Sequence, residues 1–287
     1  NTRLKMKKIL FVLLMLLPLA ATAKSKSNVR WCTFNIRLIN GEDTKAGFGW
    51  DVRKPRVVQY ILDNDMDVIG MQEVVYKQLT YLQENLEGYD YIGVGRTDGK
   101  TKGEYTCIFY KKDKYEVLDQ GNFWLSETPD VPGSVGWDAR LERVATWGKF
   151  RDKKTGKIFM AVNTHFDHIG VEARKQSALL IIEKIREIVG NRPAVVTGDF
   201  NITDQNEAYK TMVSNKFVLK DAYKISPSHG GVDYSFNNYG RIPVEKRAKI
   251  DFIFVTPNID VIRTGIPMDV QTHALSDHNP HWADLQF

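Results

Sequence analysis

A short run that ends in an acid, residues 193–201 (PAVVTGDFN), limits what this chain can fold into more than any other feature. The apolar letters AVV indicate a buried strand that stops at a glycine, so the next acid lies where regular backbone ends. Asp199 and Asn201 are two positions apart and point the same way in extended backbone. One strand end would offer a carboxylate beside an amide, unless both merely bond local backbone in an Asx turn.

The same arrangement, a strand followed by a polar residue, occurs in three other segments. Residues 29–37 alternate apolar and polar and carry Asn35 on the polar face, and a buried strand leads to Glu73. Another strand leads to His165, which a helix separates from Asp199. We interpret this as two related halves, Asn35 to Glu73 and His165 to Asp199. Their strand ends would converge at one rim, where chemistry in α/β proteins usually lies.

Two C-terminal motifs add acids and a histidine. The strand KIDFIFV carries Asp251 among apolar neighbours, where an acid is rarely buried unless it is paired or bound. The loop ALSDHNP places Asp277 directly before His278. A nearby carboxylate fixes the tautomer of a histidine and raises its basicity, as proton transfer near neutral pH requires. His278 is therefore a candidate acid–base residue.

Three more residues are candidates for binding an anion, and spacing leaves each of them open. Arg174 falls on the apolar stripe of a helix, from which it either reaches solvent or points across the rim. Arg143 precedes the strand VATWGKF and has the same two possibilities. His168 follows His165 by three positions, and its spacing alone favours a structural role.

The N-terminus predicts an export signal rather than part of the fold. Residues 6–23 have a basic start, an apolar run and small residues that end in ATA, as in a secretory signal peptide. We expect residues 1–23 to be that signal peptide, with residues 1–5 as an upstream extension. Residues 24–287 should form one domain, either periplasmic or secreted. The apolar run is too short to span a membrane, so the mature form should have no integral span.

The net charge of the mature chain does not point to any binding partner. The first 23 residues hold four of the 40 basic residues and no acid, which leaves 36 basic against 35 acidic residues. A nearly neutral chain predicts no general affinity for nucleic acid or an anionic membrane, and no protein partner can be inferred. Cys32 and Cys107 lie in apolar strand-like runs, which favours two buried thiols over a disulfide.

Taken in order, the motifs resemble the endonuclease/exonuclease/phosphatase superfamily, which has the deoxyribonuclease I-like fold. The resemblance covers the mature chain and implies an exported bacterial member with a four-layered α/β sandwich, two packed mixed β-sheets flanked by helices. Each motif is weak alone, but six occur in the family's order. They are TFN with Asn35, MQEV with Glu73, NTH with His165, GDFN with Asp199 and Asn201, KIDFIFV with Asp251, and SDHNP with Asp277 and His278.

The resemblance also implies metal-assisted hydrolysis of a phosphoester. Glu73 would ligate Mg²⁺, or Mn²⁺ as a substitute, with Asn35 on the metal side, since one carboxylate plus waters suits Mg²⁺. A zinc site on His165 and His168 is an alternative that fits less well. The candidate substrate-binding residues, chosen from spacing and not from the resemblance, are Arg143, Arg174 and His168.

The other motif residues receive implied roles at the reacting phosphorus. His165 and Asn201 would hold the phosphoryl oxygens as charge develops. Asp199 would orient or deprotonate the attacking water. Asp277 and His278 would form a second acid–base pair that Asp251 supports. Which residue is the general base stays open.

Nuclease action, as a 3'-5' exonuclease or an endonuclease, is the favoured prediction, with nucleic acid as the substrate. Arg37 stands where some abasic-site nucleases of the family carry an acid, which argues against that subfamily. Two segments are more similar to the branch of the family that contains deadenylases and their bacterial relatives than to the abasic-site nucleases. They are NFWLSETP and GWDARLERVATW. The alternative is a phospholipid or sugar-phosphate phosphodiesterase or phosphatase on the same scaffold. A non-catalytic binding protein is less favoured, because no key polar residue is missing.

Overall fold

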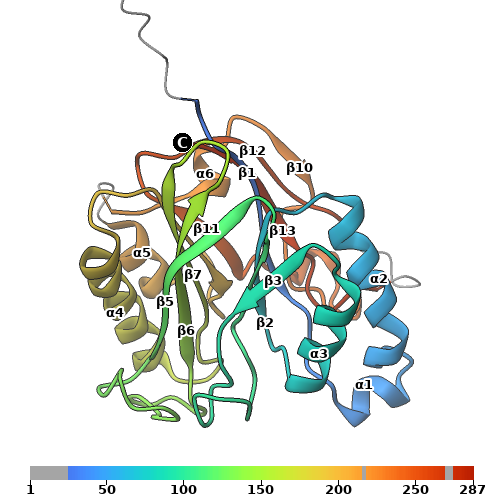
Figure 1. Ribbon diagram of the computed structural model, residues 1–287. Coiled ribbons are helices and arrows are strands. Elements are labelled where there is room, and N and C mark those ends of the chain that lie inside the picture. The colour runs from blue at the N-terminus through green and yellow to red at the C-terminus, as the bar shows by residue number, and fades with distance from the viewer. Residues whose placement is uncertain (1–24, 215–217, 269–273) are drawn as a thin grey trace, which may run out of the picture.

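The structure, a computed structural model, describes residues 25–214, 218–268 and 274–287, and its strands form two sheets that pack face to face (Figure 1). Helices α4 and α5 cover the outer face of one sheet, and α1, α2 and α3 lie beside the other (Figure 1). This arrangement confirms the four-layered sandwich that the resemblance implied. The predicted signal peptide, residues 1–23, lies outside the described residues.

One sheet has seven strands in the order β10-β12-β13-β1-β2-β4-β3. β1 and β2 are parallel, as the repeated pattern of strand, helix and strand predicts. The strands are β1 (Asn28–Asn35), β2 (Val68–Gln72), β3 (Tyr89–Ile92), β4 (Ile108–Lys111), β10 (His229–Gly231), β12 (Asp260–Ile266) and β13 (His281–Gln286). The associated helices are α1 (Gly41–Lys45), α2 (Trp50–Asp63) and α3 (Tyr76–Asn85).

The other sheet has six strands in the order β5-β6-β7-β8-β11-β9. β7 and β8 are parallel, which is the second copy of the predicted unit. The strands are β5 (Tyr115–Trp124), β6 (Val144–Asp152), β7 (Ile158–His165), β8 (Ala194–Asp199), β9 (Lys220–Asp221) and β11 (Asp251–Val255). The remaining helices are α4 (Val171–Val189), α5 (Glu207–Ser214), α6 (Ala222–Ile225) and the short 3₁₀ helix η1 (Val244–Lys246).

The space between the sheets is apolar except near one rim. Phe159 and Val195 of one sheet pack with Val68 and Leu285 of the other in a single buried cluster. Burial on both faces explains why β8 reads as a continuous apolar run in the sequence rather than as an alternating one. Cys32 and Cys107 are buried free thiols, as expected. Among the described residues, no helix combines the length and apolar character that a membrane span needs.

Towards the rim, the intersheet packing becomes a hydrogen-bonded network around Asn163. Its Nδ2 donates to the carbonyl oxygens of Met71, at 2.8 Å, and Cys107, at 3.0 Å, which both belong to the opposite half. Its Oδ1 accepts from Nε2 of Gln72, at 2.7 Å, and from the hydroxyl of Thr197, at 3.1 Å. Because a buried polar group is costly unless paired, this network fixes one register between the sheets.

Candidate active site

The predicted convergence of strand ends is confirmed at one rim. Asn35 of β1 is the register partner of Gln72, the residue before Glu73. Asp199 of β8 is the register partner both of His165 on β7 and of Asp251 on β11. A cavity of about 340 Å³ opens there. Eight of the eleven predicted site residues line it, namely Glu73, Arg143, His165, His168, Asp199, Asn201, Asp277 and His278.

Each of three of these strands is followed by a residue whose backbone is in the left-handed region. Arg37 after β1, Glu73 after β2 and Asn201 after β8 have φ values of 59°, 60° and 50°. Residues other than glycine rarely adopt this conformation, and where they do, it often marks a functional site. Here each such turn aims a polar side chain into the cavity.

Asp199 is held in place on both carboxylate oxygens. Oδ1 accepts from the backbone N–H of Asn201 at 2.9 Å, and Oδ2 accepts from Nδ2 of Asn35 at 2.9 Å. Burial, followed by the charge of Asp251, raises the pKa of Asp199 to about 7. A carboxylate with such a pKa can take up a proton near neutral pH.

His278 pairs with Asp251 behind the cavity. Nδ1 of His278 lies 2.8 Å from Oδ2 of Asp251, and Nε2 lies 3.7 Å from Oδ2 of Asp199. Burial alone would lower the pKa of His278, but Asp251 and Asp199 together raise it to about 10. The predicted pairing of His278 with Asp277 is therefore wrong in detail: the acid that hydrogen-bonds His278 is Asp251, which was expected only to support the pair. Asp277 instead accepts from the hydroxyl of Ser276 and faces Arg37.

Asn201 fixes the tautomer of His165. Its Nδ2 donates to the carbonyl oxygen of Phe166 at 3.0 Å and also lies 3.1 Å from Nε2 of His165. Nε2 must therefore accept, which leaves the proton of His165 on Nδ1. Burial, followed by the charge of Arg143, holds the pKa of His165 well below its usual range, so the ring is neutral. Both amide hydrogens of Asn201 are already used in these two contacts within the protein. Its predicted role, to hold a phosphoryl oxygen, therefore stays a prediction.

The cavity has an excess of carboxylates that suits a divalent cation. Four carboxylates line it, against two guanidinium groups, those of Arg37 and Arg143. Glu73 accepts from Nδ2 of Asn35, at 3.1 Å, and from the backbone N–H of Leu38, at 3.1 Å, and these bonds aim its remaining lone pairs at the cavity. Asn35 itself lies behind Glu73 and Asp199 and presents its nitrogen to both, so the structure gives it an orienting position.

A second set of donors, Asp199, Asp251 and His278, has ligand atoms within 4.8 Å of one another. The direct Asp251–His278 hydrogen bond accounts for part of this compactness. Glu73 is the better fit to Mg²⁺, which favours one or two carboxylates and keeps several waters.

Of the three predicted substrate-binding residues, the structure brings two to the cavity. Nη2 of Arg143 lies 3.0 Å from Nδ1 of His168, so Nδ1 accepts and the proton of His168 is on Nε2. Nη1 of Arg143 is buried and has no hydrogen-bond partner within the described residues. Arg174 does not line the cavity, because its Nη1 donates to the carbonyl oxygen of Asp167 at 3.0 Å.

Two charged residues line the cavity without having been predicted as site residues. Arg37 lies 2.9 Å from Asp43, 3.6 Å from Asp277 and 3.9 Å from Glu73, so it balances several acids at once. Glu104 enters from the turn between β3 and β4, a Gly- and Lys-rich segment in which an acid has no distinguishing signal. The departure at Arg37 was visible in the sequence, but its partners depend on how the strand ends meet.

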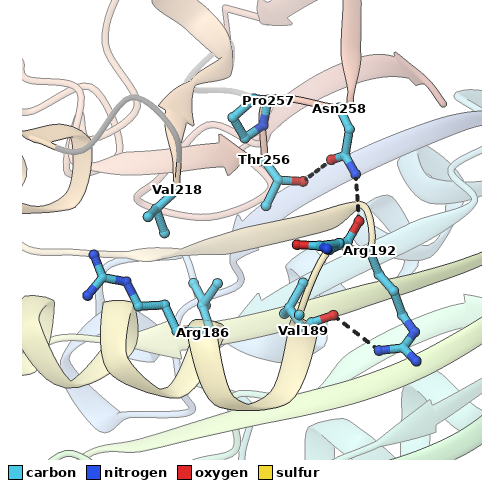
Figure 2. Close-up of a pocket in the computed structure, with 10 residues that line it drawn as sticks. Arg186, Val189, Arg192, Val218, Thr256, Pro257 and Asn258 are labelled. Carbon is cyan, nitrogen blue, oxygen red and sulfur yellow. Dashed lines mark hydrogen bonds between the residues drawn. The ribbon is translucent and has the colours of Figure 1, made fainter.

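A larger hollow, of about 470 Å³, lies at the other end of the six-stranded sheet (Figure 2). It is lined by the end of α4 and by residues that precede β8 and follow β11, including Arg186, Arg192 and Asn258. None of its lining residues is an acid or a histidine, so it offers neither a metal ligand nor a base. The rim cavity is the candidate active site.

The sequence profile of the Endonuclease/Exonuclease/phosphatase family matches residues 32–278, which include every predicted site residue. The chain belongs to this family. Its members are hydrolytic phosphoesterases that use divalent metals, and the chain is a phosphoesterase of the endonuclease/exonuclease/phosphatase family.

Three relatives place the chain within the family. A crystal structure of an endonuclease/exonuclease/phosphatase from Bacteroides vulgatus is 59% identical, covers 90% of this chain and 98% of that one, and has a TM-score of 0.88. The structure of a mannosyl-6-phosphatase from Bacteroides thetaiotaomicron is 42% identical and has a TM-score of 0.85. The match covers 90% of this chain and 100% of that one. The CCR4-Not complex 3'-5'-exoribonuclease subunit Ccr4 of Debaryomyces hansenii is 24% identical over 81% of this chain, which spans about a third (34%) of that protein.

Proposed function

We propose that the protein is an exported, Mg²⁺-dependent phosphatase that releases phosphate from a small phosphorylated sugar. The observation that carries the proposal is the meeting of Glu73, Asp199 and His278 in one cavity that holds two guanidinium groups. The choice of a sugar phosphate is supported by the 42% identity, over the whole length of the relative, to a mannosyl-6-phosphatase. It replaces nucleic acid, the substrate that the motifs alone favoured.

Glu73, oriented by Asn35, would hold the metal ion at the cavity wall. When bound, such an ion polarises the phosphoryl group and makes a bound water more acidic. The chain's own residues supply the remaining groups. Asp199 is the proton acceptor for the attacking water, because its raised pKa matches neutral pH and its position is fixed on both oxygens.

The donors to the phosphoryl oxygens are cationic. The free Nη1 of Arg143 has no partner among the described residues and lies in the cavity wall. His278 is protonated at neutral pH because Asp251 stabilises its charge, so Nε2–H acts as a donor rather than as a base. Preorganised donors of this kind stabilise the charge that develops in the transition state.

A 3'-5' exoribonuclease is the second candidate. It is supported by the 24% identity to Ccr4 over 81% of this chain. An exoribonuclease would use the same residues for hydrolysis as the sugar phosphatase. The two candidates differ in the substrate that the loops around the cavity bind.

A substrate panel tests the proposal. Phosphate release from mannose 6-phosphate, and degradation of single-stranded RNA, single-stranded DNA and bis(p-nitrophenyl) phosphate, would be measured with and without Mg²⁺. We expect Mg²⁺-dependent release from mannose 6-phosphate at the highest kcat/KM. Faster cleavage of RNA would establish the second candidate, and no hydrolysis of any ester would reject both.

A further inference from the structure

The guanidinium of Arg37 is a cation that lies beside the proposed metal ligand, Glu73. The backbone of Arg37 is fixed, because its N–H donates to Oδ1 of Asn35 at 3.0 Å and its carbonyl oxygen accepts from Nε2 of Gln78 at 2.8 Å. Nη1 of Arg37 lies 3.9 Å from Oε2 of Glu73, which is too far for a hydrogen bond. A rotation of the arginine side chain alone would close this distance and engage a lone pair that a metal ion needs.

Asp43 holds this guanidinium away from Glu73. Oδ2 of Asp43 accepts from Nε of Arg37 at 2.9 Å. The same oxygen accepts from Nδ2 of Asn40 at 2.6 Å and from the hydroxyl of Tyr239 at 3.1 Å, so the carboxylate is itself fixed in position. Only 7% of the Asp43 side chain is exposed, and solvent ions therefore screen its attraction for Arg37 only weakly.

Without the charge of Asp43, Arg37 would turn to the acids of the cavity. Two other carboxylates of the described residues lie within 4.0 Å of its guanidinium, that of Asp277, at 3.6 Å, and that of Glu73. Closer pairing of Nε with Asp277 would still leave Nη1 beside Glu73. A guanidinium bound to Glu73 would compete with a divalent cation, because both use the free lone pairs of that carboxylate.

We propose that Asp43 is a positioning residue that keeps Glu73 free for the divalent cation by holding Arg37 away from it. This inference rests on the proposed function, in which Glu73 holds the ion. Asp43 does not line the cavity, so its effect on the ion passes through Arg37. The loss of Asp43 should therefore weaken metal binding, and the additional loss of Arg37 should restore it.

Mn²⁺ binding, measured by calorimetry in the absence of substrate, tests the inference. The wild-type protein would be compared with Asp43→Asn, Arg37→Ala and the variant that carries both changes, with melting temperatures as a check on folding. We expect Asp43→Asn to bind Mn²⁺ about 10- to 100-fold more weakly, the usual effect of losing a group that orients a metal ligand. Arg37→Ala should bind Mn²⁺ at least as tightly as the wild type, because a positive charge has left the cavity, and the double variant should match the wild type.

Glu42→Gln is the matched control, since Glu42 is the exposed neighbour of Asp43 on α1. It should keep the wild-type affinity for Mn²⁺. A loss as large as that of Asp43→Asn would overturn the inference, because it would trace the effect to net charge alone.

Each other outcome overturns the inference in a distinct way. Wild-type affinity in Asp43→Asn shows that Arg37 does not need to be held. Weak binding by the double variant assigns the loss in Asp43→Asn to the local fold rather than to Arg37. Weaker binding by Arg37→Ala shows that Arg37 supports the metal site, and this result does not depend on whether Asp43→Asn folds. Absence of Mn²⁺ binding by the wild type rejects the inference together with the metal-dependent function on which it rests.

Discussion

Asp251 and His278 lie 27 positions apart in the chain, and a 2.8 Å hydrogen bond joins them behind the cavity. Asp251 is 0% exposed, which resolves the conflict between an acid and its apolar sequence neighbours: the acid is buried because it is paired. The pair keeps His278 cationic, with Nε2 directed towards Asp199.

Removing the carboxylate of Asp251 should lower the pKa of His278. We expect Asp251→Asn to bring this pKa down from about 10 and to reduce kcat by a factor of roughly 10² or more, as for other losses of a preorganised donor to the transition state. The pKa is measured by NMR titration of the imidazole, and kcat by phosphate release. Asp260→Asn, an exposed acid on β12, is the control. An unchanged pKa would show that Asp251 does not stabilise the charge.

Exchanging the donor at position 201 should reverse the tautomer of His165. In Asn201→Asp the carboxylate accepts, so the proton of His165 moves to Nε2 and the pKa of His165 rises. We expect kcat/KM to fall by about 10- to 100-fold, the usual effect of losing an orienting partner. The ¹⁵N shifts of the imidazole report the tautomer directly. Asn258→Asp, at the opposite end of the sheet (Figure 2), should leave both unaffected, and a retained Nδ1–H in Asn201→Asp would contradict the assignment.

Most of the site could be predicted because it is built at strand ends. Asp199 and Asn201 follow a buried run, and strand periodicity together with parallel pairing brings their counterparts Glu73 and His165 to the same rim. Helical periodicity places Arg174 on a face of α4, but it does not say where the end of a long side chain goes, and the carbonyl oxygen of Asp167 takes it. Glu104 was not predictable, because its place in the cavity wall depends on pairing with Arg96 and on the approach of the second sheet.

The polar network between the sheets requires a glycine in β2. A Cβ at Gly70 would meet the hydroxyl of Thr197 and the side-chain amide of Asn163 at less than contact distance. We expect Gly70→Ala to reduce the free energy of unfolding by about 1–3 kcal/mol, the usual cost of overpacking, as measured by denaturant unfolding. Gly41→Ala is the control, since a Cβ there meets nothing within 4 Å. Equal stability of the two variants would show that the network adapts freely.

His281 should make the fold sensitive to acid. Burial, followed by the charge of Lys249, lowers the pKa of His281 to about 3 from the usual 6.5. Below pH 6.5 the unfolded chain therefore binds a proton that the folded chain does not, so stability is present above this pH and is lost as the pH falls towards 3. The loss from one such group is at most about 1.4 kcal/mol per pH unit. We expect the free energy of unfolding of His281→Asn to fall less steeply than that of the wild type between pH 6 and 4.5, and parallel curves would contradict this role.

The central claim, that distant strand ends gather around one divalent cation, is tested by metal depletion and titration. Phosphate release from the best ester of the panel would be followed for protein dialysed against EDTA and then titrated with Mg²⁺, with Glu73→Gln beside the wild type and melting temperatures as a check on folding. We predict no release before Mg²⁺ is added, full recovery in the wild type, and a requirement for at least about tenfold more Mg²⁺ in Glu73→Gln. Release at the full rate after EDTA, or the same Mg²⁺ requirement in both proteins, would contradict the claim.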